Sequence, residues 1–209
     1  MPIACQLLVA TSNRGKAKEF RDLLPAELEV VTLTDLGLPS PVENGTTFAE
    51  NARLKAIAAA SASGMITMAD DSGLVVDALD GAPGLYSARF AGPDGNDAAN
   101  RQKLLGLLEG KPERERTARF IAVVVVASAN SVIAEATGIV EGHVGHDERG
   151  QHGFGYDPIF LLPDSRTMAE LDPVEKNRTS HRALATIQLL PVLRDLFGLS
   201  VTDPDERLT

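Results

Sequence analysis

Met68-Ala69-Asp70-Asp71-Ser72-Gly73-Leu74 is the stretch around which the chain is organised. The apolar run from Met65 to Ala69 predicts a strand, and two adjacent carboxylates follow it. We expect the strand to end at these acids, with Ser72 and Gly73 forming a tight turn. Open α/β sheets commonly bind ligands at the carboxyl ends of their strands, so this stretch is a candidate site. The alternative is a solvated turn, since Asp, Ser and Gly are ordinary turn residues.

The composition is typical of a water-soluble protein, with 44% hydrophobic and 23% charged residues in a chain of 209. The formal net charge of -9 opposes the electrostatic attraction that duplex DNA and anionic membranes need, so we expect neither nucleic acid nor membrane as a partner. A local basic pocket for a small anion is compatible with this charge. The longest apolar run, Ile121 to Ala127, is far too short to cross a membrane.

The expected location and domain organisation follow from the rest of the composition. Cys5 is the single cysteine, which excludes an intramolecular disulfide and suits a reducing cytosol. The first residues lack the charged and apolar regions of a signal peptide. We therefore expect a cytoplasmic protein in which residues 1–199 form a single domain and residues 200–209 form a polar tail.

A candidate anion site lies near the start of the chain. Leu7 to Ala10 predicts a buried strand that leads into Thr11-Ser12-Asn13-Arg14-Gly15-Lys16, where a helix begins. Backbone N–H groups at the helix start, together with the charge of Lys16, would bind phosphate. The alternative is an ordinary N-cap by Ser12 or Asn13 beside a solvated lysine. The glycines of a Walker A loop or a dinucleotide-binding fingerprint are missing.

A long alanine-rich helix is expected to open at Thr46-Thr47-Phe48-Ala49-Glu50-Asn51 and to end at Gly64. Thr47 and Glu50 have the spacing of a capping box, which would be the structural role of Glu50. Glu50 and Asn51 could instead project towards the acids of the organising stretch, with Lys55 one turn further along the helix. Glu43, in the loop before this helix, is either a metal ligand or a surface acid.

The second half of the chain contains a predicted β-hairpin and a histidine pair. Ala118 to Ser128 is apolar and β-branched enough for a buried central strand. Asn130-Ser131 predicts a tight turn, and residues 132–140 predict an antiparallel return strand. His143 and His146 have no third ligand nearby, so we do not favour a zinc site.

A glycine-rich loop and a second basic cluster follow. The loop, residues 150–157, contains Phe154-Gly155-Tyr156-Asp157 and precedes the last expected strand, Ile159 to Leu162. The cluster comprises Lys176, Arg178, His181 and Arg182. It flanks the start of a helix expected from Thr179 to about Phe197, with a kink at Pro191. Cations at a helix N-terminus are disfavoured unless an anion is present, which favours anion binding over a solvated basic loop.

Two basic helix starts, a carboxylate cluster and a glycine-rich loop with two aromatic residues together indicate a polyphosphate substrate that carries a nucleobase. Carboxylates approach phosphates only with a cation between them, and Mg2+ is the usual bridge. The available acids are Asp71, Glu43 and Glu50. Successive strand residues face opposite ways, so Asp70 and Asp71 are not expected to point at one metal ion.

Short motifs, in the same order along nearly the whole chain, resemble those of the inosine triphosphate pyrophosphatase family. The matching segments are Ala10 to Lys16, Thr47-Phe48-Ala49-Glu50-Asn51-Ala52 with Lys55, Ala69 to Leu74, Gly81-Ala82-Pro83-Gly84 with Ser87-Ala88-Arg89, Phe154 to Pro158, and Glu175-Lys176 with Ser180-His181-Arg182. The tail after Leu199 lies outside the resemblance.

The resemblance implies an α/β fold with a long central mixed sheet, helices on both faces and two lobes around an active-site cleft. It also implies a homodimer that hydrolyses ITP, dITP and XTP to the monophosphate and pyrophosphate, with Mg2+ as cofactor.

The family's functional positions can be carried over residue by residue as part of this resemblance. Asp71 matches the catalytic acid and metal ligand, Glu43 lies where a second metal-side acid is expected, and Ser72 matches a substrate contact. The other substrate-binding positions are Thr11, Ser12, Asn13, Arg14, Gly15 and Lys16 for the triphosphate, and Phe154, Gly155, Tyr156, Asp157, Lys176, His181 and Arg182 for the base and phosphates. Supporting roles fall to Glu50, Asn51, Lys55 and Asp70.

The expected mechanism is attack of water on the α-phosphorus. Asp71 or a neighbouring carboxylate orients or deprotonates that water, while Lys16 stabilises the pyrophosphate leaving group. The remaining alternatives are a pyrophosphatase for pyrimidine or other modified nucleotides, a non-catalytic nucleotide-binding protein, and a Rossmann-type dehydrogenase, against which the missing glycine fingerprint speaks.

Overall fold

The computed structural model describes residues 5–93 and 95–200, so the predicted tail lies outside the described residues apart from Ser200. The strands are β1 (Cys5–Val9), β2 (Leu28–Thr32), β3 (Thr67–Val76), β4 (Thr117–Ala127), β5 (Val132–Val144) and β6 (Phe160–Leu161). The α-helices are α1 (Arg14–Leu23), α2 (Phe48–Ser63), α3 (Asp97–Leu107), α4 (Pro173–Thr179) and α5 (His181–Phe197). Short 3-10 helices are η1 (Asp77–Leu79), η2 (Gly84–Arg89), η3 (Glu113–Glu115), η4 (Asp157–Ile159) and η5 (Met168–Glu170).

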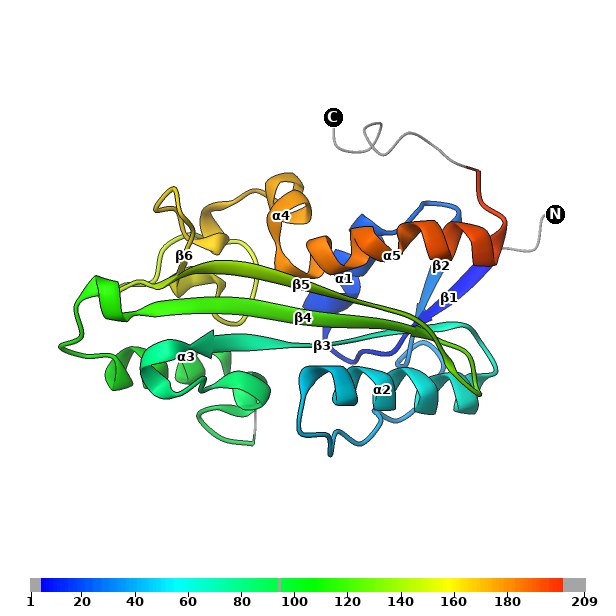
Figure 1. Ribbon diagram of the computed structural model, residues 1–209, viewed down its shortest axis with the longest axis horizontal. Helices are drawn as coiled ribbons and strands as arrows, with labels where there is room; N and C mark the ends of the chain where they lie inside the picture. The colour runs from blue at the N-terminus through cyan, green and yellow to red at the C-terminus, as the bar shows by residue number, and fades with distance from the viewer. Residues whose placement is uncertain (1–4, 94, 201–209) are drawn as a thin grey trace. The chain divides into compact units, whose positions relative to one another are not determined.

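The strands that the structure describes form one six-stranded sheet in the order β2-β1-β3-β4-β5-β6. β1 pairs in parallel with β2 and β3, whereas β5 and β6 pair antiparallel. Figure 1 shows the long strands β3, β4 and β5 running side by side. The predicted mixed sheet is confirmed, and so is the β-hairpin, in which Ser128 N donates to Ser131 O between β4 and β5.

Two compact units make up the described chain. Unit 1 contains residues 5–71, 122–138 and 182–200, and unit 2 contains residues 72–121 and 139–181. The chain passes from one unit to the other after Asp71, Ile121, Gly138 and His181. β3, β4 and β5 therefore each contribute residues to both units.

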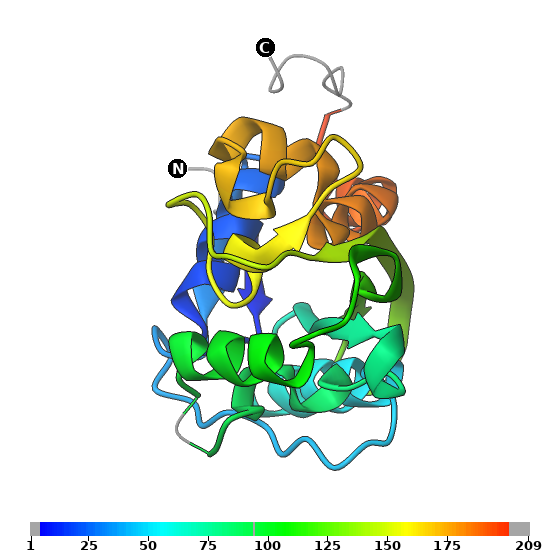
Figure 2. The ribbon, with the colours of Figure 1, turned by 90° about the vertical axis from the view of Figure 1, so that its left-hand side faces the viewer.

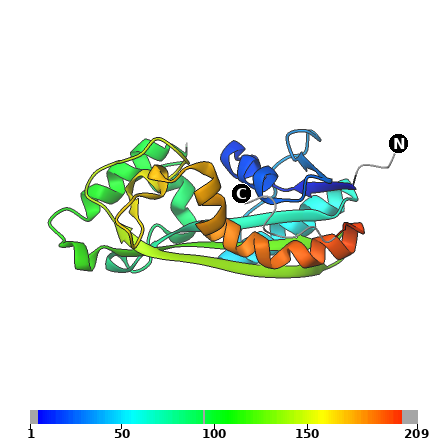
Figure 3. The ribbon, with the colours of Figure 1, turned by 90° about the horizontal axis from the view of Figure 1, so that it is seen from above.

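In unit 1, helices cover both faces of the sheet, as predicted. Leu7 and Val9 of β1 and Met68 of β3 pack with α1 and α5, whereas Leu8 and Ala69 pack with the alanines of α2. This separation follows from the alternation of side chains along a strand. Figure 3 shows α5 lying along the green strands β4 and β5. The same alternation places Asp70 on the α1 and α5 face and Asp71 on the α2 face.

Unit 2 has its own apolar core, which contains residues of β3, β4, α3, β6 and η5. Figure 2 shows green α3 and orange α4 on opposite sides of the yellow strand β6. Arg116, only 2% exposed, donates to the carbonyl oxygens of Leu108 (2.8 Å), Val144 (2.7 Å) and Gly145 (2.6 Å). These contacts join the end of α3 to the end of β5.

The prediction that the strand ends at the paired acids is wrong. β3 continues through Asp70 and Asp71 to Val76, because Leu74 and Val76 are themselves buried in the core of unit 2. The strand that ends here is β1, whose last paired residue, Val9, lies opposite Met68. The acids thus project from the middle of β3, just beyond the carboxyl end of its neighbour.

Two smaller corrections concern the end of the chain. The last strand is only Phe160–Leu161, because Asp157–Ile159 forms a 3-10 helix. The long C-terminal helix begins at His181 instead of Thr179, because Thr179 ends α4. Pro191 lies inside this helix, and the kink there stays a prediction. None of the helices in the described ranges is long and apolar enough to cross a membrane.

Candidate active site

The turn after β1 is a capped helix start. Asn13 accepts a hydrogen bond from Lys16 N (3.0 Å), and Asn13 N donates to Thr11 Oγ1 (3.1 Å). Of the two N-caps considered, the structure selects Asn13. Ser12 and Arg14 are exposed, whereas the Lys16 side chain is 17% exposed and turned towards β3.

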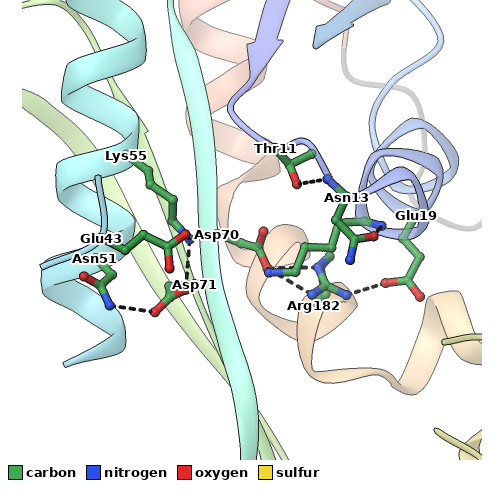
Figure 4. A network of polar contacts seen from close by, with 10 residues as sticks. Thr11, Asn13, Glu19, Glu43, Asn51, Lys55, Asp70, Asp71 and Arg182 are labelled. Atoms are coloured by element: carbon green, nitrogen blue, oxygen red, sulfur yellow. Dashed lines mark hydrogen bonds and ion pairs between the residues drawn. The ribbon is translucent and has the colours of Figure 1, made fainter. Parts of the chain in front are cut away.

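Asp70 is the centre of a buried ion-pair network in unit 1 (Figure 4). Its Oδ2 lies 2.9 Å from Lys16 Nζ and accepts hydrogen bonds from Arg182 Nη2 (2.9 Å) and Nε (3.2 Å). Arg182 Nη1 donates to Glu19 Oε2 on α1. Two carboxylates therefore balance the charges of one lysine and one arginine in a region almost closed to water.

The electrostatics of this network keep Asp70 ionised. Burial alone would raise the pKa of Asp70, but Lys16 and Arg182 outweigh burial and hold that pKa far below its usual range. Arg182 is 1% exposed and fixed between two carboxylates, so the structure assigns it to the ion-pair network. A contact between Arg182 and the substrate stays a prediction.

Asp71 faces α2 on the other side of β3, as strand alternation predicts (Figure 4). Asp71 Oδ1 accepts a hydrogen bond from Lys55 Nζ (2.9 Å), and Oδ2 accepts one from Asn51 Nδ2 (3.2 Å). Lys55 Nζ also lies 3.2 Å from Glu43 Oε1. Asp71 and Glu43 therefore converge on one cation, while Asp70 belongs to a different environment.

The Glu43 loop is attached to α2 by a glycine. Gly45 N donates to Asn51 Oδ1 (2.8 Å), so the amide of Asn51 joins this loop to Asp71. A Cβ atom at Gly45 would lie 2.7 Å from Asn51 Oδ1, too close for any larger residue without rearrangement. Gly45 stands among other turn-forming residues, so no local pattern singles it out.

Glu50 has the structural role that the capping-box spacing suggested. Thr47 Oγ1 accepts from Glu50 N (3.1 Å), and the Glu50 carboxylate accepts from Thr46 N (2.6 Å) and Thr46 Oγ1 (2.8 Å). The carboxylate thus returns to Thr46 instead of the predicted Thr47. Hydrogen bonds from Thr46 lower the pKa of Glu50. Glu43, rather than Glu50, is the acid that shares a cation with Asp71.

The pKa values of the α2 face differ from those of the Asp70 network. Burial raises the pKa of Asp71, although Lys55 acts against this. Burial opposes the charge on Lys55, but Asp70, Asp71 and Glu43 together raise its pKa. Asp71 is therefore the more basic of the two adjacent carboxylates, which is the property that a proton acceptor needs.

Unit 2 gathers a second set of predicted residues. Lys176 Nζ donates to Asp157 Oδ2 (2.6 Å), the same oxygen accepts from Phe154 N (2.8 Å), and Lys176 Nζ lies 5.0 Å from the centre of the Phe154 ring. Gly153 has a φ of +77°, and a Cβ atom there would lie 2.0 Å from Asp157 Oδ2. The Phe154 ring and backbone are thus both held by a buried ion pair.

Two further predicted residues of unit 2 are mainly buried. Tyr156 is 4% exposed and donates from its hydroxyl group to Ser87 O (2.9 Å). The His181 ring stacks on Phe120, with the ring centroids 4.7 Å apart. Ser72, at the start of unit 2, is half-buried.

Glu19 is a residue of the site that the sequence analysis missed. It lies three residues after Lys16 on α1, a spacing that puts both side chains on one side of a helix. A carboxylate so close to the apolar side chain of Phe20 was the available signal. Its partner Arg182 is 163 residues away, so the pair itself could not be read from the sequence.

The oxygen donors of the α2 face fit Mg2+. Two carboxylates, those of Asp71 and Glu43, already converge on the Lys55 ammonium, and carboxylate oxygens are the protein ligands that Mg2+ prefers. Among the described residues there is no group of three or more His, Cys, Asp or Glu side chains that could hold a metal ion. Mg2+ usually takes one or two carboxylates from the protein and completes its shell with water and phosphate oxygens.

Comparison with known proteins places these features in a wider group. The Ham1 family model matches residues 7–192. A dITP/XTP pyrophosphatase of Desulforamulus reducens is 48% identical over 195 residues, covering 92% of this chain and 97% of that protein. A HAM1 protein of Coxiella burnetii has a solved structure with a TM-score of 0.81 and 40% identity, covering 91% of this chain and 99% of that one. The solved Ham1 protein of Staphylococcus aureus gives a TM-score of 0.80 with 38% identity over the same shares.

Proposed function

The chain belongs to the Ham1 family, and from this premise we propose that it hydrolyses non-standard purine nucleoside triphosphates, namely ITP, dITP and XTP, to the monophosphate and pyrophosphate. The observation that carries the proposal is that the two adjacent acids of β3, Asp70 and Asp71, have different partners. Asp70 is an ionised carboxylate that holds Lys16, while Asp71 and Glu43 converge on the ammonium group of Lys55. A triphosphate substrate needs both a cationic side chain and a metal ion.

We propose Mg2+ as the cofactor, held by Asp71 and Glu43. When bound, Mg2+ would neutralise phosphate charge and lower the pKa of a water molecule.

The protein's own residues contribute positioning and electrostatics. Lys16 and the first N–H groups of α1 bind the phosphates and stabilise the pyrophosphate leaving group, since cations and a helix N-terminus both attract anions. Asp71 accepts the proton of the water that attacks the α-phosphorus, and its raised pKa suits that role. When Asp71 is ionised, the hydrogen bond from Lys55 Nζ keeps its carboxylate oriented.

We assign base recognition to residues of unit 2. The Phe154 ring is half-buried, and we propose that it stacks on the purine. Hydrogen-bond donors of the protein that point at the 6-keto oxygen of hypoxanthine or xanthine would have no acceptor opposite the amino group of adenine. Such buried, unpaired donors discriminate strongly between bases. We therefore expect a preference for ITP and XTP over ATP.

The test is Mg2+-dependent release of pyrophosphate from a panel of ITP, dITP, XTP, ATP and CTP. We expect pyrophosphate and the monophosphate from the first three and little from the others. Release of orthophosphate would contradict attack at the α-phosphorus, and a preference for CTP would favour the pyrimidine alternative. Asp71→Asn should abolish turnover, whereas Asp22→Asn, an exposed acid on α1, should not.

We further propose a cytoplasmic homodimer that binds no nucleic acid. The single cysteine suits a reducing compartment, and the net charge of -9 disfavours nucleic-acid binding. Light scattering on the purified protein tests the dimer, because a monomeric mass would contradict it.

A further inference from the structure

Helix α3 reaches the loop that carries Phe154 through two side chains to which the mechanism gives no role. Asp97 Oδ2 accepts a hydrogen bond from Gly155 N (2.8 Å). Arg101 Nη1 donates to Gly155 O (2.8 Å). Both polar backbone groups of one glycine are therefore held by side chains that stand one helical turn apart on the same helix.

Gly155 is a position where such contacts matter. Its φ of +61° lies in the left-handed region, which side-chain-bearing residues rarely adopt. It lies between Phe154 and Tyr156, so its conformation shapes the backbone on both sides of these two aromatic residues. A loop with a glycine at this place is flexible unless other groups fix it.

Other contacts fix the residues on either side of Gly155, and α3 fixes Gly155 itself. On one side, Asp157 accepts from Phe154 N (2.8 Å) and pairs with Lys176 of α4. On the other, Tyr156 is fixed by its hydrogen bond to Ser87 O. Figure 2 shows α3 and α4 on opposite sides of β6, which follows this loop.

Charge supports the arrangement. Arg101 Nε also lies 2.9 Å from Glu148 Oε1, so the guanidinium is held by a carboxylate while it donates to Gly155 O. The Arg101 side chain is 14% exposed, which limits the competition from water. Burial is the main cause that raises the pKa of the Tyr156 hydroxyl group, and the charge of Asp97 adds to it. Asp97 therefore acts on both Gly155 and Tyr156.

We propose that Asp97 and Arg101 are positioning residues that hold the Phe154–Asp157 loop in the conformation that receives the nucleobase. They would set the affinity for the nucleotide without touching the reacting atoms. This inference rests on the proposed function in one respect, the assignment of base recognition to Phe154.

The first test measures kinetics with ITP for Asp97→Ala, Arg101→Ala and the control Gln102→Ala, an exposed residue of the same helix. A hydrogen bond to a charged group corresponds to roughly a tenfold change or more in an equilibrium constant, so we expect KM to rise about tenfold in the first two variants. We expect kcat to change less than about threefold, and Gln102→Ala to behave as wild type. Asp97→Asn retains an acceptor oxygen and should restore most of the affinity.

A double-mutant cycle separates positioning from a general structural role. If α3 acts through Phe154, Asp97→Ala should add little to the KM of Phe154→Ala. Fully multiplicative effects on KM, or an unchanged KM in both α3 variants, would overturn the proposal.

The second test does not depend on catalysis. Amide hydrogen exchange of Gly155, followed by NMR, should become about tenfold faster in Asp97→Ala and stay unchanged in Gln102→Ala. Slow exchange in Asp97→Ala would overturn the proposal even in an inactive protein. If wild type releases no pyrophosphate from ITP while Gly155 exchange responds as expected, the proposed function fails and the α3 contact stands. Arg101→Gln serves as the second variant should Asp97→Ala not fold.

Discussion

Replacing Asp70 with asparagine should strongly destabilise the protein, although the side chain barely changes in size. The Asp70 side chain is 1% exposed and contacts both Lys16 and Arg182. In the wild type, Asp70 and Glu19 balance these two cations. The variant leaves one positive charge uncompensated in a nearly water-free region, where charge is costly.

The size of the effect follows from this burial. Removing one partner of a buried ion pair costs about 3–5 kcal/mol, because the other charge stays buried. In a protein of this size each kcal/mol lowers Tm by about 2–4 °C. We therefore expect the Tm of Asp70→Asn to fall by roughly 6–20 °C.

Thermal and urea unfolding at pH 7 measure this loss. The matched control is Asp22→Asn on α1, which breaks the exposed Lys18–Asp22 pair and should cost less than about 0.5 kcal/mol. The pH dependence gives a second check. Since the pKa of Asp70 is depressed, its stabilising effect is complete above the unfolded-state pKa and is lost as the pH falls below about 4. The difference between wild type and variant should therefore shrink in acid.

A double variant tests the charge argument directly. Lys16→Met combined with Asp70→Asn leaves only the Arg182–Glu19 pair, which is neutral overall. We expect the double variant to be more stable than Asp70→Asn alone. If the two substitutions add, or if Asp70→Asn unfolds like wild type, charge balance is not what Asp70 supplies.

The remaining predictions concern the α2 face and unit 2. Asp71→Asn should lower kcat for ITP at least about a hundredfold with a folded structure by circular dichroism, and near-normal turnover would contradict the catalytic assignment. Glu43→Gln should raise the Mg2+ concentration needed for half-maximal activity, whereas Glu50→Gln should lower Tm slightly and leave that concentration unchanged; a Mg2+ titration of both variants distinguishes the two acids. Arg116→Met leaves three carbonyl groups without their donor and should cost about 3 kcal/mol or more in urea unfolding, while an unchanged midpoint would show that water replaces the guanidinium.

Strand periodicity predicted the most informative part of the site. The opposite directions of Asp70 and Asp71 follow from the two-residue repeat of a strand, and the structure confirms them. The same local reasoning failed at Ser72-Gly73, which look like a turn but lie within β3. Their turn propensity is overridden because the residues that follow are required in the core of unit 2.

The partners of the cations could not be predicted from sequence. Lys16 and Arg182 stand at helix starts in the sequence. A cation is disfavoured at a helix N-terminus, so its presence predicts an anion nearby. The structure supplies that anion internally, as Asp70 and Glu19. Such long-range charge pairing depends on which strand and helices lie together, which no local pattern encodes.

The contrast between the two adjacent acids is itself an argument about mechanism. Two cations lower the pKa of Asp70, whereas burial raises that of Asp71, so one residue step along β3 places the two carboxylates in different electrostatic surroundings. Pairs of titratable groups whose surroundings push their pKa values apart typically divide into a fixed charge and a proton carrier. Asp70 can serve only as the fixed charge, because protonating it would leave Lys16 and Arg182 with too little negative charge. Protonating Asp71 costs less free energy, because the carboxylate of Glu43 still balances the charge of Lys55. In the proposed mechanism, the strand that carries both acids therefore keeps the fixed anion beside Lys16 apart from the proton acceptor beside Lys55.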